Sequence, residues 1–201
     1  MNRIVVTGQI PKAGLAILRR EGDVVVVPAA ARREDELIDL LRDADAAITM
    51  LSDPVTSRVI RACPRLKIVT NYAVGTNNID IAAARRRGIF VTNTPGVLTD
   101  ATADLTLALI LAVTRRIGEG DRFVRAGKFE GWDPGLMLGI SLQGKRLGII
   151  GMGRIGQAVA ARAVAFGMEV VYHTHHFEQT SSLELGAARV PFEELISTSH
   201  V

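Results

Sequence analysis

Arg146-Leu147-Gly148-Ile149-Ile150-Gly151-Met152-Gly153-Arg154-Ile155-Gly156 is the stretch that decides the fold of the second half of this chain. Its short apolar run predicts a strand, which leads into three glycines spaced G-x-G-x-x-G. A helical pattern then continues to Ala165, and a second strand is expected over Glu169–His173. Glycines so placed between a strand and a helix indicate a dinucleotide-binding site, although glycines also mark ordinary turns.

Each glycine of this motif has a distinct steric role. Gly151 permits the tight turn, and Gly153 lets the backbone approach a pyrophosphate. Gly156 lets the helix and the strand pack closely. The phosphates would bind N–H groups at the helix N-terminus, where the helix dipole favours negative charge.

The residues after the second strand bear on the choice of cofactor. A dinucleotide site normally places an acidic residue about 20 positions beyond the glycines, where it binds the ribose 2′-OH. Here Thr174, His175 and His176 occupy that region, and no carboxylate does. An acid would repel a 2′-phosphate, whereas these side chains can donate hydrogen bonds to it. The sequence therefore favours NADP(H) over NAD(H), even though Arg is the usual partner of that phosphate.

The same histidines raise the alternative of a metal site. Alternation along the strand puts His173 on the same face of the sheet as His175, and His176 follows. No further Cys, Asp or Glu has a suitable spacing, so the metal hypothesis is weak. Exposed polarity at a strand end is the plainer explanation, and we predict no metal.

The length and composition are those of an ordinary globular chain. It has 201 residues, 48% hydrophobic and 22% charged, with a net charge of +3. We expect no membrane span, and no signal peptide because a strand pattern begins at the N-terminus. The single cysteine, Cys63, excludes an intrachain disulfide and favours the reducing cytoplasm. Aromatic residues are few and no basic run is long, so nucleic-acid binding is disfavoured.

Residues 1–100 alternate between strand and helix patterns, which predicts a parallel, doubly wound α/β sheet. Strands are expected over Ile4–Thr7, Val24–Val27, Ala46–Met50, Leu66–Thr70 and Ile89–Thr92. Helices are expected over Pro11–Glu21, Glu34–Arg42, Thr56–Ala62 and Ile79–Arg87.

Ligands bind beyond the carboxyl ends of the strands in such sheets. The loops to consider are Thr7-Gly8-Gln9, Leu51-Ser52-Asp53 and Asn71–Asn78. The last loop is rich in Gly and Asn, which suits the presentation of backbone N–H groups to a ligand. A long turn with no ligand explains the composition equally well.

A long helix is expected from Thr99 to about Ile117. It is apolar almost all round, so we expect it to be buried, either within its own domain or against a partner subunit. A glycine-rich polar stretch then connects it to the strand at Arg146. The break in the alternation places a domain boundary near residues 95–100.

Several motifs together resemble those of the D-isomer-specific 2-hydroxyacid dehydrogenases, and within them the glyoxylate/hydroxypyruvate reductases. The resemblance runs from Ile4 to Val201. The motifs are Asn71-Tyr72-Ala73-Val74-Gly75-Thr76-Asn77-Asn78-Ile79-Asp80, Val91–Thr99, Ala101-Thr102-Ala103-Asp104-Leu105 and Gly151–Gly156.

The resemblance implies two domains and a set of binding residues. Residues 1–98 would form the first part of a flavodoxin-like, split substrate domain, and residues 99–201 the first part of an incomplete Rossmann domain. The helix region 101–117 would form a homodimer interface. Substrate binding is implied for Leu51, Ser52, Val74 and Gly75, and cofactor binding for Val74, Thr102, Gly151, Gly153, Arg154, Ile155, Gly156, Thr174 and His175.

The activity that the resemblance implies is reduction of a small 2-oxo acid, such as glyoxylate or hydroxypyruvate, by NAD(P)H. The family's catalytic Arg, Glu and His would lie beyond Val201, and neither Glu193 nor His200 takes their place. We therefore expect a C-terminally truncated family member that is inactive by itself. The alternative is a non-catalytic fragment that binds a dinucleotide or dimerises.

Overall fold

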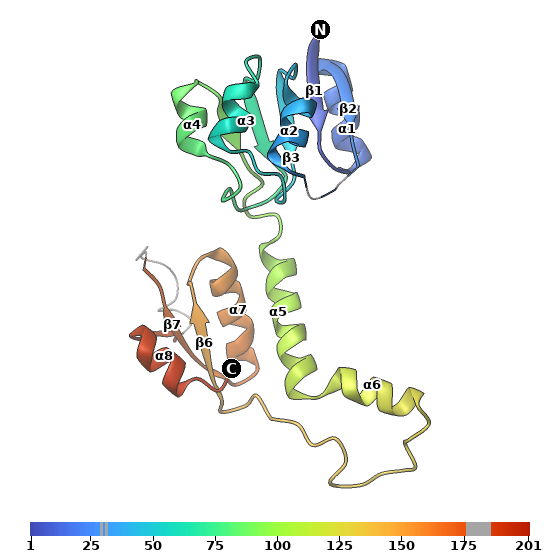
Figure 1. The fold of residues 1–201 in the computed structure, drawn as a ribbon. Coiled ribbons are helices and arrows are strands. Elements are labelled where there is room, and N and C mark those ends of the chain that lie inside the picture. The colour runs from blue at the N-terminus through green and yellow to red at the C-terminus, as the bar shows by residue number, and fades with distance from the viewer. Residues whose placement is uncertain (29, 31, 176–185) are drawn as a thin grey trace. The chain divides into compact units, whose positions relative to one another are not determined.

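A computed structural model describes residues 1–28, 30, 32–175 and 186–201 of the chain. Two compact units are formed, Met1–Gly96 and Val97–Val201 (Figure 1). Each unit is built on a sheet of parallel strands, and the predicted α/β class is confirmed.

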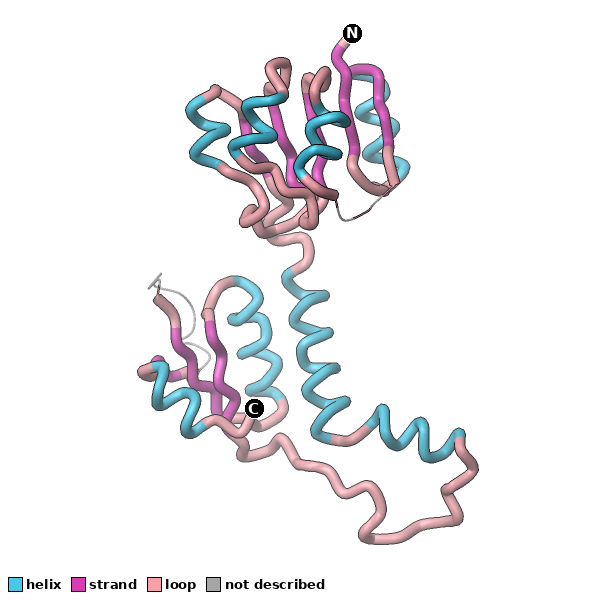
Figure 2. Tube along the Cα trace, in the orientation of Figure 1, coloured by secondary structure: helices cyan, strands magenta, loops and turns pink. Residues whose placement is uncertain are grey.

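The first unit contains a five-stranded parallel sheet in the order β2-β1-β3-β4-β5. This is the strand order of a flavodoxin-like sheet. Strands and helices alternate throughout it (Figure 2). The elements are β1 (Asn2–Val6), α1 (Lys12–Glu21), β2 (Gly22–Val26), α2 (Glu34–Leu41), β3 (Ala46–Thr49), α3 (Ser57–Ala62), β4 (Ile68–Asn71), α4 (Ile81–Arg86) and β5 (Phe90–Thr92).

One face of this sheet carries the core of the unit. Helices α2, α3 and α4 lie side by side over it (Figure 1). Their apolar residues pack on the sheet residues that point the same way, and the buried set includes Val5, Leu37, Leu41, Ala47, Val59, Ile60, Val69 and Ala84. Burial of these side chains from water is the main stabilising contribution to the unit.

The second unit contains a three-stranded parallel sheet in the order β6-β7-β8. At the other edge of β6, His200 N donates to Arg146 O and Gly148 N donates to Val201 O, both at 2.9 Å. The elements are α5 (Thr99–Thr114), α6 (Ile117–Arg125), β6 (Arg146–Ile150), α7 (Arg154–Ala165), β7 (Glu169–His173), β8 (Ala188–Arg189) and α8 (Phe192–Thr198).

The long helix differs from its prediction. It ends at Thr114 because Arg116 adopts a left-handed backbone conformation with φ of 54°, and a separate helix, α6, follows. The sequence predicts only a connecting stretch over α6. It does not predict strand β8 at all, because two residues are too short for an alternation pattern to show.

Within its own unit α5 is buried on one side only, so burial in its own domain is not complete. Burial of its other side against a partner subunit stays a prediction. Ala103 and Leu107 are buried among the residues that pack α5 and α7 together. Arg162 of α7 reinforces this contact by donating hydrogen bonds to Asp104 at 2.5 Å and Asp100 at 3.1 Å. The opposite side of α5 is exposed, with Leu105 and Leu109 each 58% accessible and Val113 77% accessible.

The cysteine and the possible membrane spans are the two remaining features that the sequence raised. Cys63 is fully buried, and burial raises the pKa of its thiol, which keeps it in the unreactive protonated form. Among the residues that the structure describes, no helix is both long and apolar enough to cross a bilayer.

Asp45 joins three segments at the start of β3. Its carboxylate accepts a hydrogen bond from the backbone N–H of Arg3 at 2.9 Å, and pairs with Arg65 at 2.9 Å and Lys67 at 3.4 Å. The Arg3 N–H, followed by the Arg65 guanidinium, lowers the pKa of Asp45 below its ordinary value of 3.8. Since the ionised form is favoured in the folded state, its contribution to stability is present above that value and is lost as the pH falls below it.

We predict that Asp45→Asn lowers the stability of the chain at neutral pH and flattens the acid limb of its stability curve. Urea unfolding at a series of pH values between about 6 and 2 measures this. Asp39→Asn is the control, because Asp39 is exposed and pairs with the neighbouring Arg42 of the same helix end. An acid limb of unchanged slope in Asp45→Asn would contradict the prediction.

Candidate functional site

The predicted substrate residues lie on two neighbouring loops of the first unit. Leu51 and Ser52 follow β3, and Val74 and Gly75 follow β4, which pairs with β3. The carboxyl ends of parallel strands meet at one edge of the sheet, so both loops begin there. All four residues are exposed.

Two asparagine amides tie these loops together. Asn71 Nδ2 donates to Gly75 O at 2.7 Å and to Asn78 Oδ1 at 3.0 Å. Asn78 Nδ2 in turn reaches across to the first loop and donates to Asp53 O at 2.9 Å and Met50 O at 3.2 Å. Asn71 is fully buried and Asn78 is half-buried, so the geometry of the two loops is set from beneath by these side chains.

A buried ion pair supports the first loop. The Asp53 carboxylate is fully buried and accepts hydrogen bonds from Met50 N at 2.7 Å, from the Thr7 hydroxyl and from Arg32 Nη1 at 3.1 Å. The Arg32 side chain is 8% exposed and also donates to Thr7 O at 2.9 Å. Removing one partner of such a pair leaves a buried charge uncompensated, which costs about 3–5 kcal/mol. Sequence reasoning missed Arg32, because its pairing with Asp53 is a tertiary contact.

The backbone of the second loop is held through its carbonyl groups. Asn93 Nδ2 donates to Val74 O at 2.7 Å, and Asn71 holds the carbonyl of Gly75. Within the described part of the chain, the backbone N–H groups of Val74 and Gly75 donate to no protein acceptor. A Cβ at Gly75 would meet no atom within 4 Å, so the space beside the loop is open. This arrangement offers two N–H donors to an anion.

The glycine motif of the second unit forms the turn from β6 into α7. Gly151 has φ of +96°, and its N–H donates to His173 O at 2.8 Å. A Cβ on Gly156 would lie 2.3 Å from Gly151 O, so only glycine allows this approach of helix to turn. A Cβ on Gly153, at the N-cap of α7, would meet nothing within 4 Å.

The first turn of α7 has the features of an anion site. Its N-terminal N–H groups lack partners within the helix, as at any helix start, and the dipole there favours negative charge. The exposed Arg154 and the half-buried Ile155 begin the helix, and no acidic residue lies in its first turn. Thr102, another predicted cofactor residue, is half-buried on α5, and its backbone carbonyl accepts a hydrogen bond from the Thr106 hydroxyl.

Thr174 and His175 follow the end of β7, where the ribose is predicted to bind. Thr174 is half-buried and His175 is exposed. The rings of His173 and His175 are in edge contact, with centroids 5.2 Å apart. His176 lies outside the described residues. Among the residues that are described, no group of three or more His, Cys, Asp or Glu is placed to hold a metal ion.

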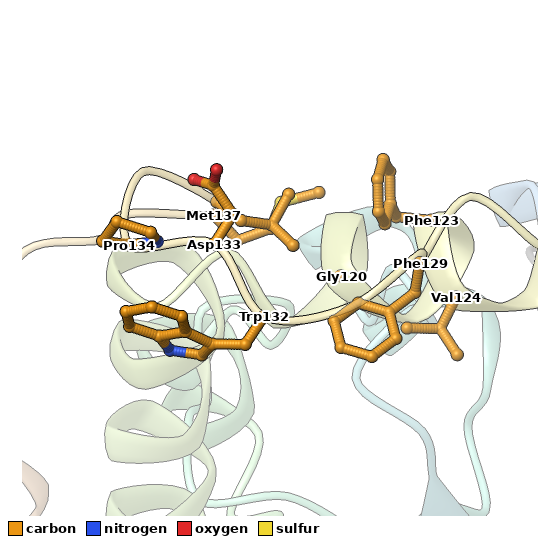
Figure 3. Close-up of a pocket in the computed structure, with 9 residues that line it drawn as sticks. Gly120, Phe123, Val124, Phe129, Trp132, Asp133, Pro134 and Met137 are labelled. Carbon is orange, nitrogen blue, oxygen red and sulfur yellow. The ribbon is translucent and has the colours of Figure 1, made fainter.

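A cavity lies elsewhere in the second unit, between α6 and the loop after it (Figure 3). Its volume is about 550 Å³ and its lining is mostly apolar. Sequence reasoning missed it because the glycines and polar residues of this segment predict a connection, although its Phe and Trp residues are a visible signal. The lining residues are Gly120, Phe123, Val124, Phe129, Trp132, Asp133, Pro134, Leu136 and Met137.

Comparisons with known proteins identify the family. Residues 4–198 match the family model described as the D-isomer specific 2-hydroxyacid dehydrogenase, catalytic domain. A glyoxylate reductase of Thermococcus litoralis is 46% identical over 98% of this chain and 61% of its own length. Another glyoxylate reductase, of Korarchaeum cryptofilum, is 44% identical over 98% of this chain and 60% of its own length. The chain therefore spans about three-fifths of the length of these relatives.

Solved structures agree with the sequence relatives. A protein of Thermus thermophilus superposes with a TM-score of 0.88 at 44% identity, over 98% of this chain and 62% of that one. An acyclic imino acid reductase in complex with NADPH and D-Arg superposes at 0.84, with 28% identity over 98% of this chain and 62% of its own. A D-lactate dehydrogenase of Aquifex aeolicus, complexed with NAD and lactic acid, superposes at 0.82, with 25% identity over 98% of this chain and 58% of its own. Sequence motifs, strand order and these matches agree, and the chain belongs to the D-isomer specific 2-hydroxyacid dehydrogenase family.

Proposed function

We propose that this chain supplies the carboxylate-binding loops and the first half of the dinucleotide site of an NAD(P)H-dependent reductase. The substrate would be a small 2-oxo acid, such as glyoxylate or hydroxypyruvate, and two relatives at 46% and 44% identity are named glyoxylate reductase. The observation that carries the proposal is the pair of N–H donors at Val74 and Gly75, on a loop whose carbonyl groups are already held. Donors fixed in advance bind an anion without a further ordering cost.

The glycine turn of the second unit fits a nicotinamide dinucleotide. The open space at Gly153, beside the N-terminus of α7, suits a pyrophosphate group. The cofactor, when bound, would supply the hydride. The chain's own share would be to hold the phosphates through the N–H groups and side chain of Arg154, and to hold the substrate carboxylate through the Val74–Gly75 loop.

In this proposal, no residue of this chain transfers the proton or polarises the substrate carbonyl. The family's Arg, Glu and His are expected beyond Val201. His200 is an unsuitable substitute, since its Nδ1 accepts a hydrogen bond from Arg146 N at the start of β6, at the other end of that strand from the glycine turn. Glu193 lies in the first turn of α8. We therefore propose that the 201-residue chain by itself has no turnover.

Preference for NADP(H) over NAD(H) is part of the proposal. Solved relatives include one NADPH complex and one NAD complex, so the preference has to be argued from this chain's own residues. Thr174 and His175 stand where an acid would bind the ribose 2′-OH, and both can donate hydrogen bonds to a 2′-phosphate. A cytoplasmic location is also proposed, because the single, buried Cys63 suits a reducing compartment.

A homodimer through the α5 region is proposed from the exposed apolar face of that helix. Leu105, Leu109 and Val113 recur at helical spacing and are each more than half exposed. Exposed apolar stripes of this kind mark interaction surfaces. The apolar cavity beside Phe129 and Trp132 belongs to the same unit and would add to the contact area.

A second candidate function is a non-catalytic module that binds a dinucleotide or dimerises. The same glycine turn and the same exposed α5 face support it. The two candidates predict different activities for a chain that is continued by the family's remaining segment. The reductase would then turn over substrate, whereas the non-catalytic module would not.

The reductase is tested by glyoxylate-dependent oxidation of NADPH. We expect the 201-residue chain to bind NADPH without turnover, and the same chain continued in frame by the C-terminal segment of its relatives to turn over. No turnover by the continued chain with any small 2-oxo acid would remove the reductase and leave the module. No NADPH binding by either version would remove both.

The glycine turn is tested by two alanine substitutions. Gly156→Ala would force a Cβ to 2.3 Å from Gly151 O, and we expect a stability loss of about 1–3 kcal/mol in urea unfolding. Gly153→Ala meets no atom, so its stability loss should stay below about 1 kcal/mol. Its NADPH dissociation constant should rise about tenfold, because the methyl group enters the phosphate space. Unchanged NADPH affinity in Gly153→Ala would count against a phosphate at this turn.

The dimer is tested by placing a charge in the exposed stripe of α5. Leu109→Glu should convert a dimer to a monomer in size-exclusion chromatography with light scattering, because a carboxylate would be buried in the interface. Ile17→Glu on α1 is the matched control, since Ile17 is 61% exposed in the other unit. A parent chain that is monomeric, or a Leu109→Glu variant that stays dimeric, would refute the α5 interface.

A further inference from the structure

Arg189 lies at the end of β7 although it is distant from it in sequence. Strand β8 pairs with β7 in parallel, with Arg189 opposite Tyr172. From this position Arg189 Nη2 donates a hydrogen bond at 3.0 Å to the backbone oxygen of Thr174, the residue after β7. A guanidinium thus lies where the sequence led us to expect only hydroxyl and imidazole groups.

We propose that Arg189 is the residue that selects NADP(H), by pairing with its 2′-phosphate. This inference rests on the proposed dinucleotide site and deepens it. The 2′-position of the adenosine ribose is recognised beyond the second strand of such a site, and an Arg nearby accommodates the phosphate. Here that strand is β7, and Arg189 contacts the first residue after it.

The chemistry of the side chain suits this ligand. A guanidinium keeps its positive charge at all physiological pH values and presents five N–H donors in a planar fork that matches phosphate oxygens. The hydrogen bond to Thr174 O orients the group toward the end of the strand. Thr174 and His175 then supply further hydrogen-bond donors beside a permanent positive charge.

Two cavities beside Arg189 indicate where a bound phosphate would lie. Arg189, His173, Val190 and Pro191 line a cavity of about 310 Å³. His173 also lines a neighbouring cavity of about 450 Å³ together with His175, Phe192 and Glu193. The Glu193 carboxylate would repel a phosphate in the second cavity, so the phosphate is placed on the Arg189 side.

Other arginines of the unit serve as internal comparisons. Arg146 is on the same sheet, but at the start of β6, and it is ion-paired with Glu169 at 2.7 Å. Arg154 begins α7 at the glycine turn, where it would contact the pyrophosphate that NADPH and NADH share. Of these three described arginines, Arg189 is the one that contacts the end of β7.

The test is titration of the 201-residue chain with NADPH and NADH by isothermal calorimetry, for the parent, Arg189→Ala, Arg189→Lys and Arg146→Ala. Arg189→Ala should weaken NADPH binding by about ten- to a hundredfold and change NADH binding less than about twofold. Arg189→Lys should restore part of the NADPH affinity, because it keeps the charge without the fork. Arg146→Ala should leave both affinities unchanged.

Each other outcome overturns the inference. Unchanged NADPH affinity in Arg189→Ala, or equal losses for NADPH and NADH in an Arg189 variant that melts at the temperature of the parent, removes Arg189 as the selecting residue while the dinucleotide site stands. Thermal melting of each variant identifies a loss caused by unfolding, which would affect both nucleotides alike. A parent chain that binds neither nucleotide overturns the dinucleotide site and this inference together.

Discussion

The contact between Gly156 and the turn at Gly151 is the constraint on which the second unit depends. A Cβ at Gly156 would lie 2.3 Å from a backbone oxygen, well inside van der Waals contact. Its absence lets α7 start directly behind β6 and points the N-terminus of the helix at the end of the strand. The same close packing brings Val159, Ala160 and Ala163 against the sheet. The packing of α7 and the geometry of the proposed phosphate site therefore depend on the same residue.

In the first unit, a network of buried polar groups holds the two loops in place. Burying the Asp53 carboxylate is costly, and Arg32, Thr7 and the Met50 N–H together offset that cost. Asn71 and Asn78 extend the network to the second loop. Since each of these groups has its partners, the network fixes one arrangement of both loops. The buried polar residues thus hold the backbone donors at Val74 and Gly75 in place before any ligand binds.

The burial of α5 shows what the average composition of a segment leaves open. The helix is apolar on nearly every side, and a segment of that composition is ordinarily enclosed. Only the side facing α7 is buried, while Leu105, Leu109 and Val113 remain accessible. An apolar composition indicates that a helix has to be buried. Only the tertiary structure shows which sides of the helix are already covered.

The sequence by itself determined the features that depend on local patterns. Alternating strands and helices predicted the parallel α/β class, the span Glu169–His173 was predicted as it is found, and the glycine spacing located the turn. Arg116 was not recognisable as a helix end, because nothing in its side chain signals a left-handed backbone. Strand β8 was too short to show a period.

Only the tertiary structure decided the partners of Arg32 and Arg189. Both side chains act on residues brought beside them by loop and strand placement, Asp53 in one case and Thr174 in the other. A periodic pattern or a motif reports what neighbouring residues along the chain do. Pairing between distant segments depends on how the sheet is assembled, and that is set by packing of the whole unit.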